Sequence, residues 1–324
     1  MSSLGALVQN ENMKIFRRLR TWIMVLLLLG ALGLMTGLIK WNDIHTDQTN
    51  WRQQVEQSLQ NNKAYLAKMP DDALPEERKE IEDAIKTKEY ALEHDINPNE
   101  QTLWDIVGAS TFMILLVTML TVIVAADMVA AEFTWGTVKL LLVRPASRGK
   151  ILLSKYISTL MFALFLLVLT FAASVLFGGL AEGFGSVSYP ALYVGADGAV
   201  HEQSMIISVL QKYGLNAVQL IMYVTFAFMI SAAFRSSAMA IAFSLFFMLV
   251  GNTLVMIFRQ YEWVKYVLFA NIDLSPYLTG GTPIRPEMTL QFSVMMLIAY
   301  FAVFHIVSWL LFTKRDVAAT IHQT

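Results

Sequence analysis

The chain has 324 residues, of which 56% are hydrophobic and only 15% are charged, and its mean hydropathy is +0.52. A soluble domain carries about 25% charged residues, so this composition excludes a single domain folded in water and indicates a membrane protein. The chain contains no cysteine, which excludes disulfides, iron–sulfur clusters and thiolate zinc sites, and its net charge of −1 gives no reason to expect a nucleic-acid partner.

Six apolar segments are long enough to cross a bilayer, which takes a helix of about 20 residues. The first could be mistaken for a signal peptide because basic residues precede it, but no small-residue cleavage site follows closely, so we expect a retained anchor. The predicted fold class is an all-α integral membrane protein with six transmembrane helices, at residues 21–39, 106–126, 151–177, 214–234, 238–258 and 290–312.

The distribution of Lys and Arg predicts the orientation, because short cytoplasmic loops are enriched in these residues. Twelve lie on one side of the predicted spans, and four lie in the short loops of the other side. We therefore expect a multi-pass membrane protein with both termini in the cytoplasm. The twelve are Lys14, Arg17, Arg18, Arg20, Lys139, Arg144, Arg148, Lys150, Lys155, Arg235, Lys314 and Arg315, and the four are Lys212, Arg259, Lys265 and Arg285.

The connecting segments differ in composition. Residues 43–105 carry apolar side chains at helical spacing on either side of Pro70–Pro75, which predicts a helical hairpin outside the cell, serving either as a lid or spacer or as a domain that captures substrate. The other expected segments are an N-terminal amphipathic helix at the membrane interface (1–20), a cytoplasmic loop or helix (127–150), a glycine-rich exterior loop (178–213), a short turn (235–237), an exterior loop with aromatic, interfacial or re-entrant helices (259–289) and a cytoplasmic tail (313–324).

The loop between the second and third spans has the most informative sequence, AEFTWGTVKLLLVRPASRGK at residues 131–150. It is amphipathic, and Pro145 ends its helical pattern. A short helix of this kind suits the transmission of force from a soluble partner. The alternative is an ordinary amphipathic loop whose basic residues follow the orientation rule.

This loop resembles the one typical of bacterial ABC-2-type exporter permeases. The resemblance rests on Glu132, Gly136-Thr137, Leu140–Leu142, Pro145, Ser147-Arg148 and Lys155. The lead-in from Asn10-Glu11 to Arg20-Thr21-Trp22 also looks like the amphipathic N-terminal helix of these permeases. The likeness covers the architecture of the whole chain, but only the loop is specific at residue level, and the long hairpin at 43–105 departs from the commonest members.

The resemblance implies a fold like that of type V ABC exporters, in the bacterial cell membrane. Each chain would form one half of a homodimer, or of a dimer with a paralogous permease. A cytosolic ABC ATPase subunit would dock on the loop. The chain has no phosphate-binding Gly-x-x-x-x-Gly-Lys-Ser/Thr motif, so ATP and Mg²⁺ are expected on that partner, with no cofactor on this chain, which is no enzyme by itself. The expected docking residues are Glu132, Gly136, Thr137, Leu141, Arg144, Pro145, Ser147 and Arg148.

Polar residues inside the spans are candidates for a translocation path, although such residues also serve to pack helices together. The candidates are Asn216, Gln219, Ser244, Asn252 and Thr253. The spans contain almost no charged residues, and we expect Lys155, near a span end, to extend toward the interface. A missing internal carboxylate argues against ion-coupled transport. No histidine, His305 included, has the neighbours of a zinc ligand, so neither a metal site nor a catalytic residue is expected.

The function predicted from the sequence is the permease subunit of an ATP-driven exporter that moves an apolar or amphipathic substrate out of the cell. A drug, an antimicrobial peptide or a lipid-like molecule would fit. The main alternative is a secondary carrier or channel without an ATPase partner, and a more distant one is an intramembrane peptidase.

Overall fold

The computed structural model describes residues 3–45, 50–70, 75–98, 100–137, 146–184, 190–195, 197–278 and 281–314. It contains six helices long and apolar enough to span a membrane, which confirms the predicted helical, multi-pass membrane protein. They are α2 (Leu19–His45), the run of α5 (Leu103–Ala109), η2 (Ser110–Phe112) and α6 (Met113–Thr134), α8 (Arg148–Glu182), α9 (Met205–Ala233), α10 (Ser237–Phe258) and α13 (Leu290–Thr313).

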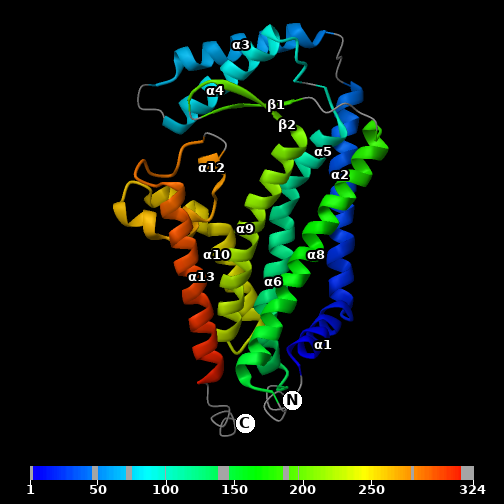
Figure 1. The fold of residues 1–324 in the computed structure, drawn as a ribbon, viewed down its shortest axis with the longest axis vertical. Helices are drawn as coiled ribbons and strands as arrows, with labels where there is room; N and C mark the ends of the chain where they lie inside the picture. Colours follow the sequence, from blue (N-terminus) through cyan, green and yellow to red (C-terminus); the bar gives the residue numbers. More distant parts are fainter. Residues whose placement is uncertain are drawn as a thin grey trace.

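These helices run side by side along the long axis of the molecule (Figure 1). The short helix α1 (Leu4–Phe16) and the carboxyl end of α13 lie at the bottom of the view, which we call the lower end. Two further helices, α3 (Trp51–Lys68) and α4 (Pro75–Glu93), lie across the top, which we call the upper end. Both ends of the described chain are therefore on the same side of the bundle.

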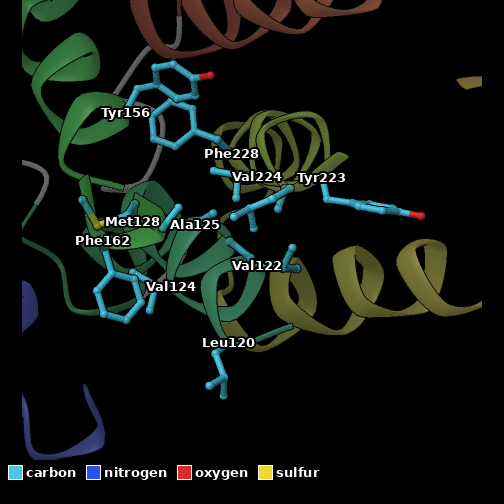
Figure 2. Close-up of a cluster of buried hydrophobic side chains, with 14 of the residues drawn as sticks. Leu120, Val122, Val124, Ala125, Met128, Tyr156, Phe162, Tyr223, Val224 and Phe228 are labelled. Carbon is cyan, nitrogen blue, oxygen red and sulfur yellow. The ribbon is translucent and has the colours of Figure 1, made fainter. Parts of the chain in front are cut away.

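Helix α6 lies at the centre of the bundle and contacts α2, α8, α9 and α10. Its side chains Val124, Ala125 and Met128 meet Phe162 of α8 and Phe228 of α9 in one continuous core (Figure 2). The peripheral helices α2 and α13 instead leave large apolar side chains exposed along their lengths, such as Leu26 and Ile298. Such faces suit contact with lipid tails or with another membrane helix.

The upper end is built from the α3–α4 pair and a small antiparallel sheet. Strands β1 (Pro190–Val194) and β2 (Val200–Ser204) form a hairpin beneath α4 (Figure 1). Lys86 of α4 donates to the Gly198 carbonyl at 3.1 Å, and the Tyr90 hydroxyl donates to Glu202 Oε1 at 3.1 Å. The pair of helices is thus held down on the hairpin by polar contacts.

Residues 178–213 were expected to form a glycine-rich loop, but their described part contains helix and strand. Helix α8 continues to Glu182, the β-hairpin follows, and α9 begins at Met205. Gly178 lies within α8, where an added Cβ would meet Leu103 Cδ1 at 2.9 Å and the Leu103 carbonyl oxygen at 3.2 Å. The glycine therefore serves the close approach of α8 to α5, and does not loosen the chain.

The aromatic loop before α13 forms three short helices, η3 (Glu262–Tyr266), α11 (Leu268–Asn271) and α12 (Ser275–Leu278). The rings of Tyr261 and Trp263 stack with centroids 6.3 Å apart, and both side chains are about half exposed. Exposed aromatic rings with polar groups are enriched at the membrane interface. The placement of these short helices at headgroup level stays a prediction.

Candidate functional site

A ring of four charged side chains, three buried and one partly exposed, joins three helices at the lower end. Lys14 of α1 donates to Glu11 Oε1 at 2.8 Å and to Glu132 Oε1 at 3.3 Å. Lys155 of α8 donates to Glu11 Oε2 and to Glu132 Oε1, both at 2.8 Å. Each ammonium bridges both carboxylates. The two positive and two negative charges leave the ring with no net charge. We call these four residues, Glu11, Lys14, Glu132 and Lys155, the charge ring.

The sequence of α1 explains why the ring closes. Leu7, Glu11 and Ile15 recur every four residues and form the face of α1 that is buried. A carboxylate in the middle of an apolar face needs a partner in the bundle, and Lys155 supplies it. Burial raises the pKa of the Glu11 carboxyl, but the charges of Lys155 and Lys14 outweigh burial, so the pKa lies below its usual 4.5.

The expectation that Lys155 extends toward the interface is wrong. Its side chain is 1% exposed and lies between two carboxylates inside the bundle. The view that the spans lack charged groups also needs correction, because α6 extends to Thr134, past the expected end at residue 126. Asp127 and Glu132 therefore both belong to the spanning helix.

Asp127 forms a second ionic cluster, about one and a half helical turns before Glu132 in α6. Its Oδ2 accepts from Arg18 Nη1 at 2.7 Å and from Arg20 Nη2, and its Oδ1 accepts from the Ser237 hydroxyl. The Asp127 side chain is 3% exposed. It ties the junction between α1 and α2 to the start of α10, so both clusters anchor the last turns of α6 to their neighbours.

A cleft of about 450 Å³ opens beside the charge ring. Helix α1 forms one wall, and the end of α6 with Trp135 and Thr137 forms the other. Trp135 is 61% exposed, and the Arg18 guanidinium lies 4.8 Å from the centre of its ring. An exposed tryptophan beside basic side chains is the type of surface on which protein partners often find an anchor.

Several predicted docking residues already have partners within the chain. Glu132 belongs to the charge ring and also accepts a hydrogen bond from the Thr137 hydroxyl. Ser147 caps α8 by accepting from the Lys150 amide at 3.3 Å, and Arg148 donates to the Thr313 carbonyl of α13 at 2.9 Å. Leu141, Arg144 and Pro145 lie outside the described residues.

Gly136 has a clear conformational role. Its φ of +69° is left-handed, as is common for the glycine that follows a helix, and its amide bonds back to the Phe133 carbonyl at 3.2 Å. An added Cβ would meet nothing within 4 Å. The glycine thus ends α6 at an open surface, next to Trp135.

The five candidate path residues do not come together. Asn216 and Gln219 of α9 line a cavity of about 390 Å³ near the upper end. Ser244 is buried in α10 without a hydrogen-bond partner among the described residues. Asn252 and Thr253 are exposed on the outer surface of α10. Asn216 and Gln219 thus share one cavity, which Ser244, Asn252 and Thr253 do not line.

No cluster of metal ligands occurs among the described residues. The His305 Nδ1 bonds to the Phe301 carbonyl at 2.8 Å, one turn earlier in α13, and the imidazole packs edge-on against Tyr156 with ring centroids 4.5 Å apart. His305 is thus a half-buried histidine that packs against the neighbouring helix α8.

Comparison with known proteins places the chain in a family. A family model described as "Protein of unknown function (DUF2705)" matches residues 79–318. The chain belongs to this family. It is 39% identical over 319 residues to the "Uncharacterized protein YhcI" of Bacillus subtilis (strain 168), covering 96% of this chain and 99% of YhcI. It is also 32% identical over 205 residues to the "Uncharacterized membrane protein YdbK" of the same organism, covering 63% of this chain and 78% of YdbK.

Reasoning from the sequence missed the two ionic clusters. Glu11 and Lys155 are separated by 144 positions, so no local pattern connects them. One feature of the sequence does point to the ring. Glu11 interrupts an otherwise apolar face of α1, and a charge at such a position requires a partner of opposite charge when the face is buried.

Proposed function

We propose that this family member is the membrane-spanning subunit of an ATP-driven exporter of the ABC-2 type, and that a separate ATPase docks at the lower-end cleft. Two such subunits would assemble in the cell membrane with the lower end in the cytoplasm. The exported substrate would be apolar or amphipathic. The proposal starts from the loop resemblance described above and is supported by the geometry of the lower end.

The observation that carries the proposal is the position of the cleft. It is lined by Trp135 and Thr137, where the chain leaves α6 and enters the segment that resembles an exporter coupling loop. The charge ring connects this point to α1 and α8 through ion pairs shielded from water. Ion pairs are stronger and less screened when buried, so a push at the cleft would move three helices together.

The structure suggests a division of roles among the docking residues. Glu132, Ser147 and Arg148 hold the lower end together through contacts within the chain. Trp135 and Arg17 instead present exposed side chains at the cleft. We therefore assign direct contact with the ATPase to Trp135, Arg17 and the surface at Gly136. Glu132 acts through the charge ring.

The test is purification of the tagged chain from its own bacterial membranes, with measurement of co-purifying phosphate-loop ATPase and of ATP turnover. Trp135→Ala and Arg17→Glu should each reduce recovery of the ATPase. A buried tryptophan anchor is worth about 2 kcal/mol or more, which is roughly a 30-fold loss of affinity. Trp41→Ala is the matched control, because Trp41 is 67% exposed near the carboxyl end of α2, at the upper end of the bundle and away from the cleft. Purification of wild type without any ATPase would contradict the proposal.

One observation favours a second candidate, an ion-coupled carrier. Charged residues buried inside a membrane bundle often form proton or ion pathways, and Lys155 lies between two carboxylates. The purified chain in proteoliposomes with a trapped pH-sensitive dye distinguishes the two. An exporter subunit should show no proton flux without ATPase, whereas proton flux through the wild-type chain alone would establish the carrier.

A further inference from the structure

A cavity of about 720 Å³ lies at the upper end. It is bounded above by α3 and α4 and below by the first turns of α9, with β1 between them. Its walls mix apolar side chains with amides and hydroxyls such as Gln203, Ser208 and Gln211. Such walls suit a ligand that itself carries many hydrogen-bonding groups.

The cavity runs along the outer edge of β1. Pro190, Ala191, Leu192 and Tyr193 all border it, whereas β2 contributes Gln203 alone. Neighbouring side chains of a strand point to opposite faces, so four consecutive lining residues place the space beside the strand. The sheet has two strands in the described part of the chain, and β1 pairs only with β2. The other edge of β1 is therefore open.

The hairpin geometry shows which backbone groups face the cavity edge. The Gly195 amide donates to the Ala199 carbonyl at 2.9 Å, so this pair is hydrogen-bonded. Hydrogen-bonded and non-bonded pairs alternate along an antiparallel ladder. In the observed register, Tyr193 and Ala191 then point their amides toward β2. Leu192 directs its N–H and C=O outward, where no backbone partner exists among the described residues.

The upper cavity is lined by two lysines, Lys88 of α4 and Lys212 of α9. Neither forms an ion pair within the described part of the chain. Lys88 donates to the Ser58 hydroxyl at 2.6 Å. The nearby Asp105 carboxylate is occupied by the Thr102 amide and hydroxyl, at 2.8 and 2.6 Å. Glu100 is the other acid that lines the cavity, and it is exposed.

Lys212 connects this cavity to a second one. Lys212 and Leu215 line both the large cavity and the cavity of about 390 Å³ that contains Asn216 and Gln219. The spacing of three or four residues places these side chains on one face of α9. The acid of the second cavity, Asp273, accepts from the Ser275 amide and hydroxyl. Lys212 thus lies where the open edge of β1 meets the polar face of α9 that lines the second cavity.

We propose that the upper cavity binds a peptide in extended conformation, which adds to the open edge of β1 as a third strand and places a carboxylate at Lys212. Strand addition supplies backbone hydrogen bonds that do not depend on sequence, and pockets for alternate side chains supply selectivity. This inference deepens the proposed function by naming peptides as the substrate class. Binding itself is measured without ATP or an ATPase.

The experiment uses the full chain in nanodiscs and a pool of random-sequence peptides of about the length of β1, with free carboxyl termini. Peptides retained by the protein are identified by mass spectrometry and compared with those retained by empty nanodiscs. Leu192→Pro removes the outward N–H and leaves the ladder to β2 intact, since proline is tolerated on the free side of an edge strand. Leu192→Ala is the matched control that keeps the N–H. A second probe is the same pool with amidated carboxyl termini.

Wild type and Leu192→Ala should enrich peptides, and Leu192→Pro should lose about tenfold of that binding, the effect of one backbone hydrogen bond. Lys212→Gln should weaken binding of the free-carboxyl pool and leave binding of the amidated pool unchanged.

Equal retention by Leu192→Pro and wild type would overturn the proposal, as would absence of enrichment by wild type. A change from dimer to monomer in Leu192→Pro without peptide binding would instead assign the edge to a second copy. ATPase co-purification from the same cells shows separately whether the proposed function stands.

Discussion

The Lys155 ammonium lies 2.8 Å from both Glu11 Oε2 and Glu132 Oε1. One side chain of α8 therefore connects the N-terminal helix α1 to the end of the central helix α6. Because Lys155 is 1% exposed, water does not compete for these contacts. The first two predictions follow from this arrangement.

Lys155→Met should destabilise the protein strongly. Removing one partner of a buried ion pair leaves uncompensated charge and costs about 3–5 kcal/mol. Lys14→Met is the matched control, since Lys14 is 36% exposed and surface ion pairs contribute only about 0–1 kcal/mol. Thermal unfolding in detergent, followed by tryptophan fluorescence, measures both. The double variant with Lys155→Met and Glu11→Gln should lose less stability than the two single variants lose together. If the two losses simply add, the two residues are not coupled.

Stability should also depend on Glu11 at acidic pH. Burial raises the pKa of this carboxyl, but Lys155 and Lys14 lower it by more, so the folded value lies below the ordinary 4.5. A lowered folded pKa contributes stability above the unfolded pKa, and that stability is lost as the pH falls through the folded value. The unfolding temperature should therefore drop as the pH falls below 4.5, and this drop should be smaller in Glu11→Gln. The same drop in both proteins would exclude Glu11 as the cause.

Gly178→Ala should loosen the contact between α8 and α5. The new Cβ would meet Leu103 Cδ1 at 2.9 Å and the Leu103 carbonyl oxygen at 3.2 Å, and backbone cannot move aside easily. Overpacking of this kind costs about 1–3 kcal/mol. Gly30→Ala is the control, because nothing lies within 4 Å of its added Cβ and alanine favours the helix. Equal unfolding temperatures for the two variants would argue against the close helix contact.

Cysteine labelling tests the orientation, and the chain has no native thiol to interfere. Gln60 on α3 and Ala238 at the start of α10 are both exposed, at opposite ends of the bundle. With the lower end in the cytoplasm, an impermeant maleimide should label Gln60→Cys in intact cells and should label Ala238→Cys only after the cells are opened. The reverse pattern would invert the topology and remove the cleft from the reach of a cytosolic ATPase.

The sequence alone determined the class of protein and its six spans, because a bilayer imposes a length and an apolar composition that each helix must meet by itself. It also indicated the helices α3 and α4, whose apolar residues recur at helical spacing around the break at Pro70–Pro75. The loop motif remains the basis of the functional proposal.

Only the tertiary structure decided which charged and polar groups meet. Glu132 was expected on the cytoplasmic segment after the second span, yet α6 continues through it and Lys155 pairs with it inside the bundle. Gly178 was expected in the glycine-rich exterior loop, yet it lies in a helix that packs against Leu103. Span positions follow from local composition, whereas ion pairs and close helix contacts join residues far apart in the chain, so they depend on how the helices are rotated and stacked against one another.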